Sequence, residues 1–185
     1  MSEQWPGDEP DLDEVHDEEE PELRVVEHDE GDGLHIPDDV ELLEGEARGT
    51  RRGVGIVLSR AAPETSNALL EAAFEELDRV GVGREQVTVM LVPGPFELAL
   101  GAMALAKTRR YSCVVALGDA TGSAVIAGEA ASGLQLAGLE TGIPVAFGVL
   151  TEGASDTAAR GVEAVRTALE MADVFQQLRA AAKAH

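Results

Sequence analysis

The chain has 185 residues, which is enough for one domain of ordinary size with some chain left over. Its net charge of −21 is concentrated in residues 1–49, where 20 acidic residues are accompanied by only two basic ones, Arg24 and Arg48. The remaining chain carries a net charge of only −3. Because binding to nucleic acid requires clustered Lys and Arg side chains, this charge distribution argues against a nucleic-acid partner.

Residues 1–40 combine high charge with several prolines and glycines and few large apolar groups. Such a segment cannot bury enough apolar surface to offset the entropy of the chain. We therefore predict a disordered acidic tail over residues 1–40 and a folded domain over residues 41–185. The tail is interpreted as a solubilising segment, or alternatively as an electrostatic tether for a basic protein partner. Its histidines lack the spacing of metal ligands, so no metal site is predicted.

Neither a secretory signal nor a membrane-spanning run is recognised. The N-terminus lacks a positively charged region followed by an apolar one, and no apolar run approaches the length needed to cross a membrane. Cys113 is the only cysteine and lies in an apolar run, which predicts a buried and inert thiol. We expect a cytoplasmic protein without a membrane partner.

Regular secondary structure is predicted from residue 40 onward, beginning with a short edge strand at 40–43. Continuous apolar runs predict four buried strands, at 53–59, 86–92, 112–117 and 145–150. Apolar residues at helical spacing predict four helices, at 63–80, 96–107, 124–141 and 154–182. Strict alternation with short connections favours parallel strands joined by right-handed helical crossovers. The predicted fold is a three-layer, doubly wound α/β domain with a parallel four-stranded sheet.

The stretch VVALGDATGSAVIAGE, residues 114–129, predicts a buried strand, a corner rich in small residues and the start of a helix. Ligands of α/β sheets tend to bind at such corners, where backbone N–H groups are free. Thr121, Gly122 and Ser123 are therefore predicted to cradle an anion, or alternatively to cap the helix. Asp119 beside them would repel phosphate. GxGxxG, Walker A, CxxC and HExxH patterns are absent, which removes the dinucleotide, nucleoside triphosphate and zinc interpretations.

Six longer motifs resemble, in their order along the chain, the lumazine synthases of riboflavin biosynthesis. They are GIVLSR at 55–60, VPGPFELALGAMALA at 92–106, VVALG at 114–118, AGEAASGL at 127–134, LETGIPVAFGVLT at 139–151 and EMADVFQQL at 170–178. The resemblance implies a flavodoxin-like sheet and a homo-oligomer built from pentamers, with active sites between subunits and, in some members, an icosahedral shell. It also implies the condensation of a ribitylaminopyrimidinedione with a butanone phosphate, without metal or organic cofactor.

The family's binding residues are only partly retained. Ala61 stands where family members usually have an aromatic residue that stacks on the pyrimidine ring, and a methyl group cannot stack. The PG-x-x-E loop survives in Gly94 and Glu97, which the resemblance places against the ribityl chain. Between them, Phe96 follows Pro95, which replaces a small residue and removes one N–H donor.

The family's catalytic positions are lost. The segment after the third strand is shorter than in the family and lacks its histidine and basic residue, and no histidine occurs between His35 and His185. A folded-domain imidazole for general acid–base catalysis is therefore absent. Arg160 is the only cation near the place of the family's phosphate-binding arginine, and the family's lysine is missing. No catalytic residue is predicted. The predicted ligand-binding residues are Ala61, Gly94, Pro95, Phe96, Glu97, Thr121, Gly122, Ser123 and Arg160.

The sequence thus predicts a lumazine-synthase-like homo-oligomer that has lost the condensation activity and serves as a scaffold or assembly protein. One alternative is an active lumazine synthase with unusual loops, because proximity and orientation alone accelerate reactions. The other is a non-catalytic binder of a flavin, a lumazine or a phosphate-bearing ligand. The site residues also have purely structural explanations: Glu97 as a carboxylate of a first helical turn, Arg160 as a solvated residue, and Ser123 as a helix cap.

Overall fold

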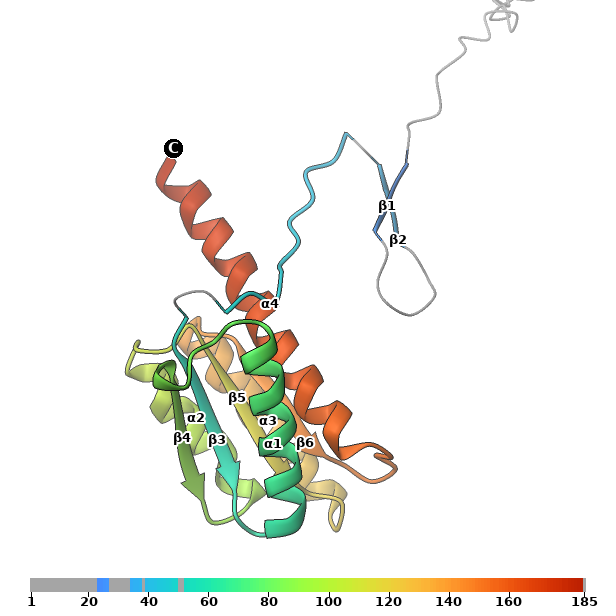
Figure 1. Cartoon of the computed structure of the whole chain (residues 1–185), viewed down its shortest axis with the longest axis vertical. Helices are drawn as coiled ribbons and strands as arrows, with labels where there is room; N and C mark the ends of the chain where they lie inside the picture. The colour runs from blue at the N-terminus through green and yellow to red at the C-terminus, as the bar shows by residue number, and fades with distance from the viewer. Residues whose placement is uncertain (1–22, 27–33, 38, 50–51, 185) are drawn as a thin grey trace, which may run out of the picture. The chain divides into compact units, whose positions relative to one another are not determined.

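The computed structural model describes residues 23–26, 34–37, 39–49 and 52–184 (Figure 1). The chain divides after Leu42 into two units. In the first unit, β1 (Leu23–Val26) pairs with β2 (Leu34–Pro37) in antiparallel register. These two strands were not predicted from the sequence; their short apolar and β-branched stretches favour extended backbone. Residues 1–22 and 27–33 of the predicted tail lie outside the described residues.

The second unit contains the predicted sheet of four parallel strands. They are β3 (Val54–Ser59), β4 (Val87–Val92), β5 (Cys113–Asp119) and β6 (Val145–Leu150), arranged in the order β4-β3-β5-β6. The prediction of an edge strand at residues 40–43 is wrong. Those residues have irregular backbone. Val40 and Leu43 are 53% and 43% exposed, so their side chains are not buried against the core as those of a sheet strand would be.

Within the described residues, three α-helices and two short 3-10 turns connect the strands of the sheet, and a fourth α-helix follows the last strand. They are α1 (Pro63–Arg79), α2 (Leu98–Lys107), α3 (Ala124–Thr141), α4 (Thr157–Ala184), η1 (Arg84–Gln86) and η2 (Pro95–Glu97). In Figure 1, α1 and α4 lie together on one face of the sheet, and α2 and α3 pair on the other. The three-layer α/β prediction is confirmed. None of the described helices is long and apolar enough to cross a membrane.

The two layers of helices bury opposite faces of the same central strands. Ile56 of β3 packs with Leu69 and Leu169 on the α1–α4 side, whereas Val57, the next residue, packs with Leu98 on the α2–α3 side. This alternation is the ordinary consequence of the two-residue period of a strand. Cys113 is fully buried as predicted, and burial raises the pKa of its thiol to about 12.

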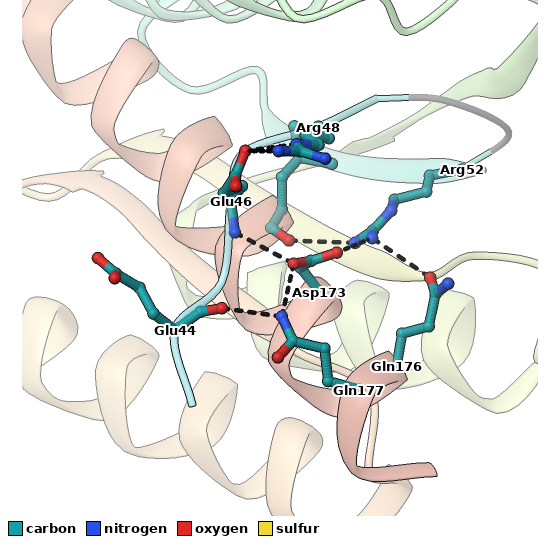
Figure 2. Close-up of polar contacts among 8 residues, drawn as sticks. Glu44, Glu46, Arg48, Arg52, Asp173, Gln176 and Gln177 are labelled. Atoms are coloured by element: carbon teal, nitrogen blue, oxygen red, sulfur yellow. Dashed lines mark hydrogen bonds and ion pairs between the residues drawn. The ribbon is translucent and has the colours of Figure 1, made fainter. Parts of the chain in front are cut away.

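The segment that leads into β3 is fastened to α4 by polar contacts (Figure 2). The buried guanidinium of Arg52 donates hydrogen bonds to the carboxylate of Asp173, to the Leu169 carbonyl oxygen (3.2 Å) and to Oε1 of Gln176 (3.2 Å). Asp173 also accepts from the Glu46 backbone N–H at 3.2 Å. These contacts fix both the start of the sheet and the C-terminal helix.

Candidate functional site

The predicted site residues follow the carboxyl ends of neighbouring strands. Ala61 follows β3, Gly94 to Glu97 follow β4, and Thr121 to Ser123 follow β5. Arg160 lies in the first turn of α4, after β6. Because all four strands are parallel, their carboxyl ends lie at one edge of the sheet, and the fold brings these segments to that edge. We call this edge the carboxyl edge.

The loop between β4 and α2 presents an aromatic ring and a carboxylate at the carboxyl edge. Gly94 has extended backbone, and a Cβ atom placed on it would lie 3.1 Å from Oε2 of Glu97. The Glu97 carboxylate therefore lies directly over the Gly94 backbone. Phe96 is 63% exposed, although a phenyl ring of this size is usually buried. The loop can therefore offer a hydrogen-bond acceptor and a stacking surface to a ligand.

The corner between β5 and α3 satisfies both hydrogen-bond donors of Thr121. Asp119 accepts hydrogen bonds from the Thr121 backbone N–H at 2.9 Å and from the Thr121 hydroxyl at 2.7 Å. These bonds, with a smaller contribution from Thr65, hold the pKa of Asp119 below its ordinary value, so the group is charged at neutral pH. Ser123 Oγ accepts from the Ile126 N–H at 3.3 Å, as an N-cap does. This geometry favours the capping interpretation of Ser123 over an anion cradle.

Arg160, the remaining cation near the family's phosphate position, is engaged within its own helix. Its guanidinium forms a 2.9 Å ion pair with Glu163, one turn further along α4. A phosphate group would have to compete with Glu163 for this arginine. The structure therefore places an acidic side chain beside both polar groups that were predicted to hold phosphate, Asp119 at one and Glu163 at the other.

The predicted site residues at the carboxyl edge line none of the three hollows described next. Three hollows of the second unit are lined by other residues: one lies between α3, β6 and α4, one lies along α1 and η1, and one lies between α4 and the α2–β5 connection. Seven large apolar side chains are exposed along β4 and the α2–α3 layer: Val89, Leu91, Phe96, Leu100, Val125, Leu136 and Leu139. Where exposed apolar side chains form a contiguous patch, they are typical of surfaces that contact another protein.

Residues 52–176 match the model of the 6,7-dimethyl-8-ribityllumazine synthase family. The chain belongs to this family. It is 41% identical over 156 residues to the 6,7-dimethyl-8-ribityllumazine synthase of Edwardsiella ictaluri, an alignment that covers 76% of this chain and 100% of the relative. It is 38% identical over 155 residues to the enzymes of that name from Yersinia pestis and Yersinia pseudotuberculosis, covering 76% of this chain and 99% of each relative.

Family membership confirms the resemblance inferred from the six motifs. Within this lumazine synthase domain, sequence reasoning missed Thr65, which lies in the first turn of α1 and helps to hold Asp119 in its charged form. Thr65 lies in the helix that follows β3 and Asp119 ends β5, and these two strands are neighbours in the sheet. The pattern Asp-x-Thr at residues 119–121 was a usable signal for the hydrogen bond between Asp119 and the Thr121 backbone N–H. An aspartate side chain commonly accepts a hydrogen bond from the backbone two residues further along the chain.

Proposed function

We propose that this member of the lumazine synthase family is a homo-oligomeric scaffold or assembly protein that does not catalyse the family's condensation at an enzymatic rate. The observation that carries the proposal is the corner after β5. There, ionised Asp119 takes up both donors of Thr121, and Ser123 caps α3. No histidine occurs between His35 and His185 to replace the missing acid–base residue.

Charge supports this proposal. The family's reaction uses a phosphate-bearing substrate, and a phosphate near the corner would face the carboxylate of Asp119. Two like charges 4 Å apart repel by about 1 kcal/mol in water and by about 4 kcal/mol at the effective dielectric constant of a protein surface. At the other side of the edge, Glu163 occupies Arg160 at 2.9 Å. The retained polar groups thus disfavour the substrate's anionic group.

Exposed apolar side chains support the assembly part of the proposal. Leu100 and Leu139 are 74% and 76% exposed on α2 and α3, and Leu91 is 63% exposed on the edge strand β4. Burying such residues against neighbouring subunits removes apolar surface from water at about 25 cal/mol per Å². A pentamer-based assembly, as the family resemblance implies, provides those neighbours.

The competing proposal is that the chain is an active lumazine synthase. Its support is the 41% identity to the Edwardsiella ictaluri enzyme over that enzyme's whole length, together with the position of Glu97 over Gly94. In such an enzyme, Glu97 and the exposed Phe96 would hold and orient the ribitylamino substrate, and proximity would supply the acceleration.

The deciding experiment supplies both family substrates to the full chain and follows formation of the lumazine by its absorbance. We expect no turnover above the uncatalysed rate in a protein whose fold is verified by circular dichroism, with the Edwardsiella ictaluri enzyme as the positive control. Turnover that is lost in Glu97→Gln would overturn the proposal in favour of the active enzyme. An absorbance band of a co-purified flavin or lumazine would instead indicate a non-catalytic binder.

A further inference from the structure

Two hollows lie side by side along α4, near the amino ends of β5 and β6 and away from the carboxyl edge. The basic hollow, about 580 Å³ in volume, lies between α4 and the α2–β5 connection. The apolar hollow, about 320 Å³ in volume, lies between α3, β6 and α4. Ile143 lines both of them, and the consecutive α4 residues Met171 and Ala172 line the apolar and the basic hollow respectively, so the two hollows adjoin.

Four cations surround the basic hollow. Arg109 and Arg110 line it from the α2–β5 connection, and Arg179 and Lys183 line it from α4. Among the described residues, no carboxylate forms an ion pair with any of these four side chains. By contrast, Arg52, which also lines the hollow, is held by a carboxylate of α4 (Figure 2). Neighbouring positive charges without counter-charges attract an anion with several negative groups.

The backbone at Arg109 gives a second, independent observation. Its φ of 58° is the left-handed conformation at the end of α2, where glycine is the most favourable residue. Arg109 is the only residue other than glycine with a positive φ in the described part of the chain. An arginine at this position costs stability, and a role for its guanidinium outside the helix would account for it.

The apolar hollow offers space for an apolar group directly beside these cations. Its lining includes the side chains of Leu134, Met171 and Phe175. The guanidinium carbon of Arg179 lies 6.0 Å from the centre of the Phe175 ring, and Nε of Arg179 donates a hydrogen bond to the Phe175 carbonyl oxygen at 3.1 Å. One residue pair of α4 therefore places a cation of the basic hollow next to an aromatic ring of the apolar hollow.

We propose that the two hollows together bind one small amphiphilic anion, an organic diphosphate with an apolar body. Its diphosphate would lie among the four cations, and its apolar body would lie against Met171 and Phe175. A diphosphate has several negative oxygens that guanidinium groups bind in pairs, whereas the single charge of a fatty acid would leave most of the cations unmatched. Hollows of several hundred Å³ are typical of sites for small molecules, which favours such a ligand over a membrane surface or a nucleic acid.

Isothermal titration calorimetry of the full chain in magnesium-free buffer tests both parts of the proposal. The probes are geranyl diphosphate, whose organic part is an apolar chain, ADP, whose organic part is polar, and inorganic pyrophosphate, which has no organic part. We expect geranyl diphosphate to bind at least about tenfold more tightly than pyrophosphate, because burial of two methylene groups already accounts for about that factor. ADP should bind no more tightly than pyrophosphate. Between about 0.01 M and 1 M salt the Debye length falls from about 30 Å to about 3 Å, so the affinity for pyrophosphate should fall at least about fivefold.

Variants separate the binding of the head from the binding of the body. Arg179→Gln should weaken both pyrophosphate and geranyl diphosphate at least about fivefold. Arg109→Gly should do the same with an unchanged or higher melting temperature, because it introduces the residue that the left-handed conformation favours. Met171→Gln should weaken geranyl diphosphate at least about threefold and leave pyrophosphate unchanged. The matched control is Arg84→Gln, which removes a charge from an exposed ion pair with Asp78 and should leave both affinities unchanged.

Four results would overturn the proposal. The first is the absence of binding of both diphosphates at millimolar concentration. The second is equal affinity for pyrophosphate and geranyl diphosphate, or tighter binding of ADP, which would exclude the apolar hollow. The third is binding that is lost in Arg160→Gln but kept in Arg109→Gly, which would assign the diphosphate to the carboxyl edge. The fourth is binding to phosphatidylserine vesicles that is lost in Arg179→Gln, without binding of geranyl diphosphate, which would assign the cations to a membrane surface. None of these results depends on whether the protein catalyses the condensation.

Discussion

Arg52 and Asp173 form an ion pair at the junction between the start of the sheet and the C-terminal helix. The side chain of Arg52 is 9% exposed and that of Asp173 is 19% exposed, so neither charge is freely hydrated. Asp173 is satisfied on its other oxygen by the Glu46 backbone N–H and by Gln177 Nε2 at 2.9 Å (Figure 2). The pair therefore joins residues about 120 positions apart through one connected set of hydrogen bonds.

Removing the carboxylate should destabilise the protein. Asp173→Ala leaves the buried guanidinium of Arg52 without its counter-charge, and we expect the free energy of unfolding to fall by about 2–4 kcal/mol. Chemical denaturation of the full chain measures this change. The control is Asp78→Ala, which breaks an exposed pair with Arg84 and should cost less than about 1 kcal/mol. Equal effects of the two variants would contradict the assigned role.

Stability should also fall in acid because of Glu76. This carboxylate of α1 is 4% exposed and accepts hydrogen bonds from Arg79 (2.8 and 2.5 Å) and from Arg166 of α4 (2.7 Å). The hydrogen bonds from Arg79, followed by the one from Arg166, hold its pKa below the ordinary value of 4.5. A carboxylate with a lowered folded-state pKa stabilises the fold above its unfolded-state pKa, and that stabilisation is lost as the pH falls through the folded-state pKa.

We therefore expect the melting temperature to decline below about pH 4.5, where the unfolded chain begins to bind the proton that the folded chain resists. Glu76→Gln should lower the melting temperature at pH 7. It should also make the melting temperature less dependent on pH below about pH 4.5. Differential scanning calorimetry from pH 3 to pH 7 measures both effects. A Glu76→Gln profile parallel to the wild-type profile would show that other carboxylates dominate acid unfolding.

The elements that the sequence predicted best are those whose ends carry their own chemical signals. The helix predicted at 124–141 has those bounds in the structure, because Ser123 caps its first turn and Gly142 takes the left-handed conformation after its last. The strands at β3 and β5 were recognisable because their residues are buried on both faces. By contrast, α2 begins at Leu98 and not at residue 96, since Gly94 is extended and Pro95 starts a 3-10 turn.

The site was less predictable because its chemistry depends on pairs of residues. The sequence indicated that Asp119 lies beside Thr121, but not that its carboxylate accepts both of the threonine's donors. Likewise, Arg160 was a candidate phosphate ligand until the helix placed Glu163 against it. Arg109, Arg110, Arg179 and Lys183 line one hollow because the packing of α4 brings two distant segments together, and composition alone gave no indication of this cluster of cations.

A matched pair of glycine substitutions tests the close packing of α1 on α4. A Cβ atom on Gly161 would lie 2.6 Å from the Leu69 carbonyl oxygen, which is backbone and cannot move aside cheaply, so Gly161→Ala should cost about 1–3 kcal/mol. Gly128, in exposed α3, has nothing within 4 Å of its Cβ position, and Gly128→Ala should stabilise the protein by about 0.5–1 kcal/mol. Thermal unfolding of both variants measures the difference; equal effects would contradict the packing shown here.

The exposed apolar side chains of the α2–α3 layer should be required for assembly. Leu139→Glu places a charge on a residue that is 76% exposed in the single subunit, so it should reduce the particle mass without lowering the melting temperature of the subunit. Analytical ultracentrifugation measures the mass. The control is Leu34→Glu, which changes an exposed leucine of the first unit. An unchanged mass in Leu139→Glu would exclude this part of α3 from the subunit contacts.

If the charge of Asp119 repels phosphate, as we propose, removing that charge should strengthen phosphate binding. Asp119→Asn removes the negative charge beside Thr121 while keeping a side-chain oxygen that can accept from the Thr121 N–H. We expect the affinity for inorganic phosphate, measured by isothermal titration calorimetry, to rise about tenfold, which corresponds to about 1.4 kcal/mol. Glu152→Gln, an exposed carboxylate in the connection after β6, is the control and should change the affinity little. If Asp119→Asn binds phosphate no better than the control does, the charge of Asp119 is not what excludes phosphate from this corner.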